Sequence, residues 1–201
     1  DLQPGRYTLR LAPPLGDLSA AQADLAADLA EFCGDGLLRA TPDQALLICG
    51  IPGGRLAETV ERAGRADLLD RSGRQALACS GASVCRLGTC RSRDLAARLR
   101  DSPVAGVRIS GCPNSCACHH VAAIGLEGVQ RQVAGAWVSC YEVHAGGRLD
   151  ADGVVLGRRL GSVRDDDLPD LLREIAALGA EPTPEAIASL VVARTVETLQ
   201  R

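Results

Sequence analysis

The stretch "SGCPNSCACHH", residues 110–120, brings three cysteines and two histidines into one short segment. A second cysteine pair lies upstream in "CSGASVC". Five residues separate Cys79 from Cys85, and three separate Cys112 from Cys116, with 26 residues between the two pairs. Both segments contain Gly, Ser or Pro between the cysteines, and these residues favour turns. The sequence therefore predicts two loops that each carry a pair of thiols.

This pattern of four thiols indicates a metal centre. Four thiolates in two pairs are what a cubane iron–sulfur cluster requires, and loops of this composition let backbone N–H groups turn toward the sulfides. Structural zinc prefers a tighter knuckle, with two residues between its cysteines. A zinc site is therefore the second interpretation, and unliganded cysteines in a core are the third.

The composition describes a globular chain of 201 residues, 46% of them apolar, which suits one large domain or two small ones. Aromatic residues make up 2%, which argues against a stacking platform for single-stranded nucleic acid. A net charge of -3 gives no electrostatic reason to expect nucleic acid or an anionic membrane as a partner. All 22 basic residues are arginine, which suits carboxylates and oxyanions, although a GC-rich genome would produce the same bias.

No stretch approaches the ~18 to 20 continuous apolar residues of a membrane span, and the first residues lack the pattern of a secretory signal. We therefore expect a cytoplasmic protein without membrane insertion. Nine cysteines is an odd number, which favours metal ligation or redox chemistry over a disulfide framework. The absence of Met indicates that the chain does not begin at its own translation start.

Residues 1–70 predict a small α+β layer of ferredoxin-like type. "RYTLRLAP" alternates as a strand does, "DLSAAQADLAADLAEFCGDG" is an amphipathic helix, "LLRAT" and "ALLICGI" are short strands, and "GGRLAETVERAG" begins a second helix. Ser19 and Gln22 form a capping box at the start of the first helix, and the glycines of "CGDG" end it. Residues 64–74 are expected to connect this region to the next.

Residues 71–201 predict a mixed α/β domain. Residues 83–100 have a helical pattern, 106–110 form a strand, and the second cysteine loop follows. "AWVSCYEVHAG" and "GVVLGRR" alternate like strands of a sheet. Two amphipathic helices, "DDDLPDLLREIAALG" and "PTPEAIASLVVARTVETLQR", end the chain, and we expect their apolar faces to pack on the sheet. The fold class is therefore α+β.

The segments "ACSGASVC" and "VRISGCPNSCACHHVAAIGLEGV" resemble the sirohaem and 4Fe-4S domain of the nitrite and sulfite reductase family. That family combines two cysteines five residues apart with a later Gly-Cys-Pro-Asn-x-Cys loop. Upstream, "LLRATPDQALLICGIP" is similar to the Arg-x-Thr-x-x-Gln segment of the family's ferredoxin-like half domain, and "PLGDLSAAQ" to the turn before it. Downstream, the likeness extends into "GRLDADGVVLGRRLG", so nearly the whole chain is covered.

The resemblance implies that Cys79, Cys85, Cys112 and Cys116 hold a 4Fe-4S cluster. By its place in the motif, Cys116 would also bridge the cluster to the iron of a sirohaem, so that single electrons pass from one to the other. Asn114 would shape the loop between two ligands.

The upstream segment implies a second set of cofactor-binding residues. Arg39, Thr41 and Gln44 match the polar segment that faces the tetrapyrrole in the family, and arginine suits the carboxylates of sirohaem. Asp43 stands where many members have a basic residue, and a carboxylate there would repel an anionic substrate or a sirohaem carboxylate. The alternative for Asp43 is an ordinary surface turn.

One departure concerns the substrate pocket. In the family two such halves share one polypeptide, and the basic residues that grip the oxyanion come largely from the first half. This chain resembles the second half alone. We therefore expect another chain, or a second copy of this one, to complete the active site, unless the reaction has been lost.

The expected activity is the six-electron reduction of nitrite or sulfite, a small oxyanion, with a donor such as ferredoxin; this makes the chain an oxidoreductase. The "AAIGLEGV" segment after the cysteine loop favours the ferredoxin-dependent type. One alternative is an electron-transfer or scaffold module that keeps a cluster without catalysis. Another is an enzyme similar to precorrin-3B synthase, although the loop of that family usually has Lys-Gly in place of Asn114 and Ser115.

The other cysteines, the histidines and two aromatic residues are expected to have structural roles. Small buried hydrophobic roles are expected for the other five cysteines, which are Cys33, Cys49, Cys90, Cys118 and Cys140. Cys118 is also a candidate for a redox or ligand role because it lies two residues from Cys116. His119 and His120 are expected to orient the cysteine loop rather than deliver protons. His144 is expected on a solvated strand face, and Trp137 and Tyr141 in packing.

Overall fold

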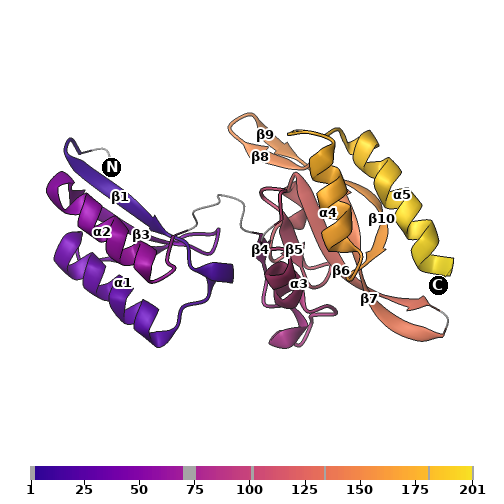
Figure 1. The fold of residues 1–201 in the computed structure, drawn as a ribbon, viewed down its shortest axis with the longest axis horizontal. Helices are drawn as coiled ribbons and strands as arrows, with labels where there is room; N and C mark the ends of the chain where they lie inside the picture. Colours follow the sequence, from indigo (N-terminus) through magenta and orange to yellow (C-terminus); the bar gives the residue numbers. More distant parts are fainter. Residues whose placement is uncertain (1–2, 70–75, 101, 134, 181, 201) are drawn as a thin grey trace. The chain divides into compact units, whose positions relative to one another are not determined.

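The structure is a computed structural model that describes residues 3–69, 76–100, 102–133, 135–180 and 182–200, without the side chains of residues 196–200. The chain divides into two compact units, residues 1–73 and 74–201. Each unit is described by itself below, with the elements labelled as in Figure 1.

Unit 1 is a three-stranded antiparallel sheet with two helices packed on it (Figure 1). The strand order is β1-β3-β2, so the last strand in sequence lies in the middle. Its elements are β1 (Arg6–Leu11), the short helix η1 (Pro14–Gly16), α1 (Ala20–Cys33), β2 (Leu38–Ala40), β3 (Leu46–Pro52) and α2 (Gly53–Arg65). Leu11, Leu29, Ile48 and Ile51 are fully buried between sheet and helices. The order strand, helix, strand, strand, helix confirms the predicted ferredoxin-like arrangement.

The start of α1 is set by local hydrogen bonds. Ser19 Oγ accepts from the backbone N–H of Gln22, and the Gln22 side chain accepts from the backbone N–H of Ser19. This reciprocal pair confirms the predicted capping box. The helix ends at Cys33, where Gly34 follows and its N–H donates to Ala30 O.

Unit 2 is built on a mixed sheet of five strands in the order β10-β7-β6-β5-β4. The strands are β4 (Leu77–Ala78), β5 (Arg108–Ser110), β6 (Ile124–Val133), β7 (Ala136–Ala145) and β10 (Arg158–Arg164). The neighbours β4, β5 and β6 run parallel, whereas β6, β7 and β10 run antiparallel. A separate hairpin joins β8 (Arg148–Asp150) to β9 (Gly153–Val155).

Helices complete unit 2. Its helical elements are η2 (Gly81–Ser83), α3 (Ser92–Arg98), η3 (His119–Val121), α4 (Leu168–Ala177) and α5 (Pro184–Gln200). In Figure 1, α5 lies beside β10, α4 packs beside α5, and α3 lies beside β4 and β5. The buried face of α4 carries Leu168, Leu171, Leu172 and Ile175, and Val191 of α5 is fully buried. The predicted packing on the sheet is therefore confirmed for α5, whereas α4 contacts α5.

The structure corrects three predicted elements. The helix predicted over 83–100 is shorter, because turns extend from Val84 to Arg91 and only Ser92–Arg98 is α-helical. The strand predicted over 153–159 is two strands, which belong to different sheets. β6, which is ten residues long and central to the sheet, was not predicted. Glycines at 125 and 128 and polar residues at 130–132 interrupt its apolar pattern.

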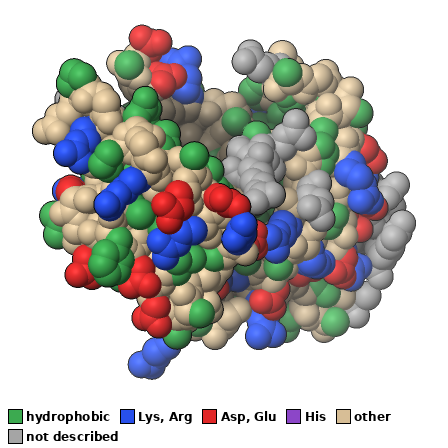
Figure 2. All heavy atoms as spheres, turned by 60° about the vertical axis from the view of Figure 1, so that its left-hand side comes forward, with side chains coloured by type: hydrophobic (Ala, Val, Ile, Leu, Met, Phe, Trp, Pro, Cys, Tyr) green, Lys and Arg blue, Asp and Glu red, His purple; other side chains and the backbone are tan. Residues whose placement is uncertain are grey.

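The surface carries both signs of charge. On the face drawn in Figure 2, arginine and acidic side chains are interspersed. Several are joined in exposed ion pairs, such as Arg65 with Glu61 and Arg148 with Asp150. Within the described part of the chain, the helices are too short or too polar to span a bilayer.

Candidate functional site

The parallel pair β4 and β5 brings the two cysteine loops together. Leu77 pairs with Arg108 and Ala78 with Ile109, so both strands run toward the same edge of the sheet. Cys79 leaves β4 directly at this edge, and its N–H still donates to Ile109 O over 3.1 Å. Cys112 follows β5 by two residues. Parallel strands with short exits therefore deliver one cysteine of each pair to the same place.

A hydrogen bond to sulfur joins the loops. The backbone N–H of Gly111 donates to Cys79 Sγ over 3.1 Å, and Ser92 Oγ lies 3.4 Å from the same sulfur. Ser92 Oγ also donates to the carbonyl of Cys79 over 2.8 Å. Because the Ser92 hydroxyl donates to this carbonyl, the Gly111 N–H is the donor aimed at the sulfur. Hydrogen bonds of this kind are typical around cysteines that bind metal.

Gly111 is required by close packing. A Cβ at this position would lie 2.7 Å from the carbonyl oxygen of Cys90 and 2.8 Å from Gly81 Cα. The carbonyl of Gly111 in turn accepts the N–H groups of Thr89 and Cys90, over 2.8 and 2.9 Å. The backbone before Cys112 therefore lies directly on the first cysteine loop, and a side chain there would push the loops apart.

The second cysteine of each pair lies in a tight turn. The Cys85 N–H donates to Gly81 O over 2.8 Å. Ser115, before Cys116, has a left-handed backbone with φ of 56°, and its carbonyl accepts the Cys118 N–H over 2.7 Å. Cys112 is buried, Cys79 and Cys85 are partly buried, and Cys116 and Asn114 are exposed. The four thiols thus differ in exposure, from the buried Cys112 to the exposed Cys116.

All nine cysteines are free thiols in the structure. No three thiol sulfurs in the described chain lie within 4.8 Å of one another. Tetrahedral zinc with Zn–S bonds of about 2.3 Å needs sulfurs about 3.8 Å apart. The described thiols are thus spaced more widely than the sulfurs around one tetrahedral ion.

The other five cysteines divide into two groups. Cys33, Cys90 and Cys140 are buried, as predicted. Burial raises the pKa of the Cys140 thiol to about 11 and also raises that of Cys90, so both stay protonated. The prediction of burial is wrong for Cys118, which is exposed, and only partly right for Cys49, which is half-buried.

The residues predicted to face a tetrapyrrole lie around β2 of unit 1. Arg39 is on β2, and its guanidinium holds both carboxylate oxygens of Asp35, with nitrogen–oxygen distances of 3.1 and 2.7 Å. Thr41 accepts the Ala45 N–H over 3.1 Å and donates to Asp43. Gln44 has a left-handed backbone with φ of 59°. Thr41 and Gln44 are therefore part of one tight turn between β2 and β3.

Asp43 belongs to that turn as well. Its carboxylate accepts from the Thr41 hydroxyl and is 2.6 Å from Arg10 Nη2. These contacts lower the pKa of Asp43, with the Thr41 hydrogen bond as the largest favourable cause. Asp43 is therefore an anion whose charge is partly offset by Arg10, in the surface turn that was the alternative interpretation.

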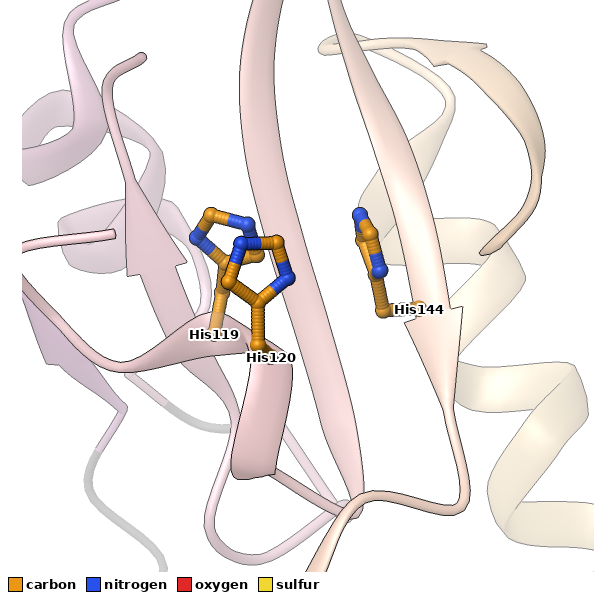
Figure 3. A group of neighbouring side chains, drawn as sticks. All are labelled: His119, His120 and His144. Carbon is orange, nitrogen blue, oxygen red and sulfur yellow. The ribbon is translucent and has the colours of Figure 1, made fainter. Parts of the chain in front are cut away.

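The three histidines of the chain lie together (Figure 3). Their ring centroids are 4.0 Å apart for His119 and His120, 5.0 Å for His119 and His144, and 5.3 Å for His120 and His144. His144 is only 4% exposed, so its prediction on a solvated strand face is wrong. Burial, together with the neighbouring His120 and His144, lowers the pKa of His119 to about 4. His119 is therefore neutral at neutral pH.

A buried carboxylate was missed by the sequence analysis. Glu142 on β7 is 2% exposed and is held by Arg131 and by Arg159, whose Nε lies 2.8 Å from Oε2. Glu142 also lies directly opposite Glu127 in the β6–β7 register. The alternating pattern around Tyr141 predicted a strand, but such a pattern does not show which of its polar side chains will be buried. Tyr141 is buried as predicted, whereas Trp137 is 71% exposed and does not pack.

These features define an α+β protein in which a ferredoxin-like half domain precedes a mixed sheet with two cysteine loops. Residues 1–66 match the family model of the nitrite/sulfite reductase ferredoxin-like half domain. The chain belongs to the nitrite and sulfite reductase family. Both the family and the α+β fold class were predicted from the sequence, and both are confirmed.

Among curated relatives, "Sulfite reductase [ferredoxin] 2" of Mycolicibacterium paratuberculosis is 33% identical over 195 residues, which cover 87% of this chain and 35% of that protein. "Ferredoxin--nitrite reductase" of Synechococcus elongatus is 29% identical, with 86% of this chain and 36% of that protein covered. The chain thus spans about a third of the length of these relatives.

Solved structures agree on the fold. The Mycobacterium tuberculosis NirA protein superposes with a TM-score of 0.76 at 29% identity, covering 96% of this chain and 39% of that one. Dissimilatory sulfite reductase I superposes with a TM-score of 0.65 at 12% identity, covering 96% and 68%. At that lower identity the likeness concerns the fold alone.

Proposed function

We propose that this chain is the cluster-bearing and sirohaem-bearing part of a nitrite or sulfite reductase, an oxidoreductase for a small oxyanion. The observation that carries the proposal is the hydrogen bond from Gly111 N–H to Cys79 Sγ, because it joins the two cysteine loops at a sulfur. The relatives named as ferredoxin-dependent sulfite and nitrite reductases support the same activity.

The donor set fits a 4Fe-4S cluster held by Cys79, Cys85, Cys112 and Cys116. All four are free thiols, and the described chain has no trio of thiol sulfurs compact enough for a single ion. A cubane spreads its four ligands over four irons, so its cysteines stand farther apart than those of zinc. The Gly111 N–H, which donates to Cys79 Sγ, would support a cluster-bound thiolate in this role.

The exposure of Cys116 suits the predicted contact with sirohaem. A thiolate at the open end of the cysteine set can be shared with a neighbouring iron, whereas the buried Cys112 cannot. When bound, the cluster and the sirohaem supply one-electron steps to a substrate that needs six. The protein holds the thiolates, and the exposed Asn114 shapes the loop between two of them.

Arg39, Thr41 and Gln44 are proposed to bind the sirohaem. At the surface, Arg39 forms a bidentate ion pair with the carboxylate of Asp35. The same geometry suits a carboxylate of the macrocycle, which would compete with Asp35 for the guanidinium. The turn hydrogen bonds of Thr41 hold the backbone around Gln44 in place.

The oxyanion pocket is proposed to need a second polypeptide segment, either a partner chain or another copy of this chain. The electron donor is proposed to be a ferredoxin, in keeping with the names of the relatives. The cytoplasmic location stays a prediction.

Optical spectra test the cofactor assignment. The chain would be purified without oxygen from cells that make sirohaem, and iron, labile sulfide and absorbance would be measured. We expect a broad cluster band together with the Soret and red bands of sirohaem. Cys79→Ser, Cys85→Ser or Cys112→Ser should lose cluster iron, whereas the buried Cys140→Ala control should keep it. A broad band without haem bands would instead support a cluster-only electron-transfer module.

Turnover tests the activity. With the natural partner segment present, oxidation of reduced methyl viologen would be followed with sulfite and with nitrite. We expect one of the two anions to be reduced, and Cys116→Ser to abolish reduction. Failure of a haem-loaded sample to oxidise the dye with either anion would contradict the proposed reductase activity.

A further inference from the structure

A second group of metal-ligand side chains lies outside the four proposed cluster cysteines. It contains His119, His120 and His144, which are all the histidines of the chain. Each offers one ring nitrogen, and the three nitrogens lie within 4.8 Å of one another. Figure 3 shows the rings of His119 and His120 rising from η3 toward the ring of His144 on β7.

The backbone is shaped to bring these rings together. Gly125 on β6 pairs with His144 on β7, so the two residues share one face of the sheet. A Cβ at Gly125 would lie 2.0 Å from the carbonyl oxygen of His119. Glycine at 125 therefore allows η3 to lie directly against β6, which places His119 beside His144.

The rings present buried nitrogens without protein partners. His119 is fully buried, and within the described structure neither Nδ1 nor Nε2 has a hydrogen-bond partner. His144 Nδ1 is likewise buried and unpartnered. An imidazole nitrogen left in this state has lost its hydrogen bond to water without gaining another, which is a cost to folding. A ligand that accepts these lone pairs would remove the cost.

Glu127 orients the ring of His144 and lies close to that of His119. Its Oε2 lies 3.2 Å from His144 Nε2, within hydrogen-bonding geometry, and 3.4 Å from His119 Nε2, outside it. A carboxylate that accepts from Nε2–H leaves the lone pair on Nδ1. Metal-binding histidines typically hold such a carboxylate behind the ring, and it fixes the tautomer that binds metal.

We propose that His119, His120 and His144 bind one divalent transition-metal ion through their ring nitrogens, with Glu127 as the positioning carboxylate behind the rings. Three neutral imidazoles select ions of the zinc, copper, nickel and cobalt group over Mg²⁺ and Ca²⁺, which prefer oxygen. Zn²⁺ is the natural probe because it needs no redox partner and accepts a site of three histidines.

The proposed ion would tie the second cysteine loop to the sheet. His119 follows Cys116 by three residues, and His144 lies near the end of β7, opposite Gly125 of β6. An ion bound to both would fasten the end of the cysteine loop to the strand pair β6–β7. This inference does not depend on the proposed reductase activity, because it concerns histidines and not the four cysteines.

Zinc binding to the whole chain tests the proposal. The chain with its cluster in place would be equilibrated with Zn²⁺, and bound zinc would be measured by mass spectrometry and its ligands by X-ray absorption. We expect one zinc per chain with nitrogen ligands that show the imidazole pattern. His120→Asn should remove it; His120 is half-buried, so this change disturbs packing least. His144→Asn should have the same effect.

Glu127→Gln tests the positioning role, and two control variants remove a different carboxylate and a nearby thiol. Glu127→Gln should weaken zinc binding about 10–100-fold, as loss of a supporting carboxylate does. Glu142→Gln removes the glutamate directly opposite in the β6–β7 register and should leave zinc affinity unchanged. Cys118→Ser should also leave it unchanged, since its thiol is not among the proposed ligands.

Three results would overturn the proposal. They are the absence of bound zinc in the cluster-loaded chain, zinc ligated by sulfur, and equal zinc binding by the wild-type chain and both histidine variants. Iron content and the cluster absorbance report folding in every sample. A loss of reductase activity with zinc binding intact would count against the proposed function and leave this site standing.

Discussion

The backbone N–H of Gly111 donates a hydrogen bond to Cys79 Sγ over 3.1 Å, although 32 residues separate the two in sequence. The donor directly precedes Cys112, so a single bond positions one cysteine loop against the other. Because a hydrogen-bond donor stabilises the thiolate, the same bond prepares Cys79 as a ligand. The first cysteine loop is thus held against the second by a backbone donor.

Gly111→Ala is expected to disrupt this site. The new Cβ would lie 2.7 Å from Cys90 O and 2.8 Å from Gly81 Cα. Both are backbone atoms, which cannot move aside as the end of a flexible side chain can. Overpacking of this kind costs about 1–3 kcal/mol and would move the loops apart. We expect reduced iron and sulfide content with unit 1 unaffected. Gly106→Ala is a control because nothing lies within 4 Å of its added Cβ, although its positive φ adds some strain.

Glu142→Gln is expected to destabilise unit 2 at neutral pH by about 1–3 kcal/mol. Burial alone would raise the pKa of Glu142, but the hydrogen bonds from Arg159 and Arg131 outweigh it and lower the pKa below the usual 4.5. A lowered folded-state pKa means that the stabilisation is present above the unfolded pKa and is lost as pH falls through the folded value. Urea unfolding should therefore show a difference between wild type and variant at pH 7 that shrinks below about pH 4.5. An unchanged difference at acid pH would contradict this.

Cys118 and Cys140 are expected to differ sharply in alkylation. Cys118 is exposed, whereas Cys140 is 1% exposed with a pKa raised to about 11 by burial. Since the thiolate is the nucleophile, iodoacetamide at pH 8 should modify Cys118 in the folded chain long before Cys140. Peptide mass spectrometry measures both rates in one sample. Urea should make the two rates similar, and equal rates without urea would show that Cys140 is accessible.

Ser19→Ala is expected to cost about 1 kcal/mol in the stability of unit 1. The substitution removes the Oγ that accepts the Gln22 N–H. The second bond of the capping box, from the backbone N–H of residue 19 to the Gln22 side chain, then stands alone. Chemical unfolding followed by circular dichroism measures the loss. Ser19→Asp retains a capping oxygen and should recover most of the stability; a variant as weak as Ser19→Ala would argue against a capping role.

Local patterns predicted several elements well. The capping box at Ser19 and Gln22 marks the start of α1 because its hydrogen bonds span only three residues. The alternation of β1 and β7 marks strands for a similar reason, since it reflects side chains on successive faces. The helix predicted over 83–100 failed because the turns around Gly81 and Gly88 depend on packing against Gly111, which is distant in sequence.

By itself, the sequence determined the α+β class, the order of elements in unit 1, and the four cysteines worth testing as ligands. These follow from periodicity, from turn chemistry and from spacing along the chain. Only the tertiary structure decided that Cys79 meets Gly111, that His144 is buried beside His119, and that Glu142 lies under two arginines. Each of these contacts depends on the register of neighbouring strands, which forms between segments far apart in the chain and leaves no local pattern to read.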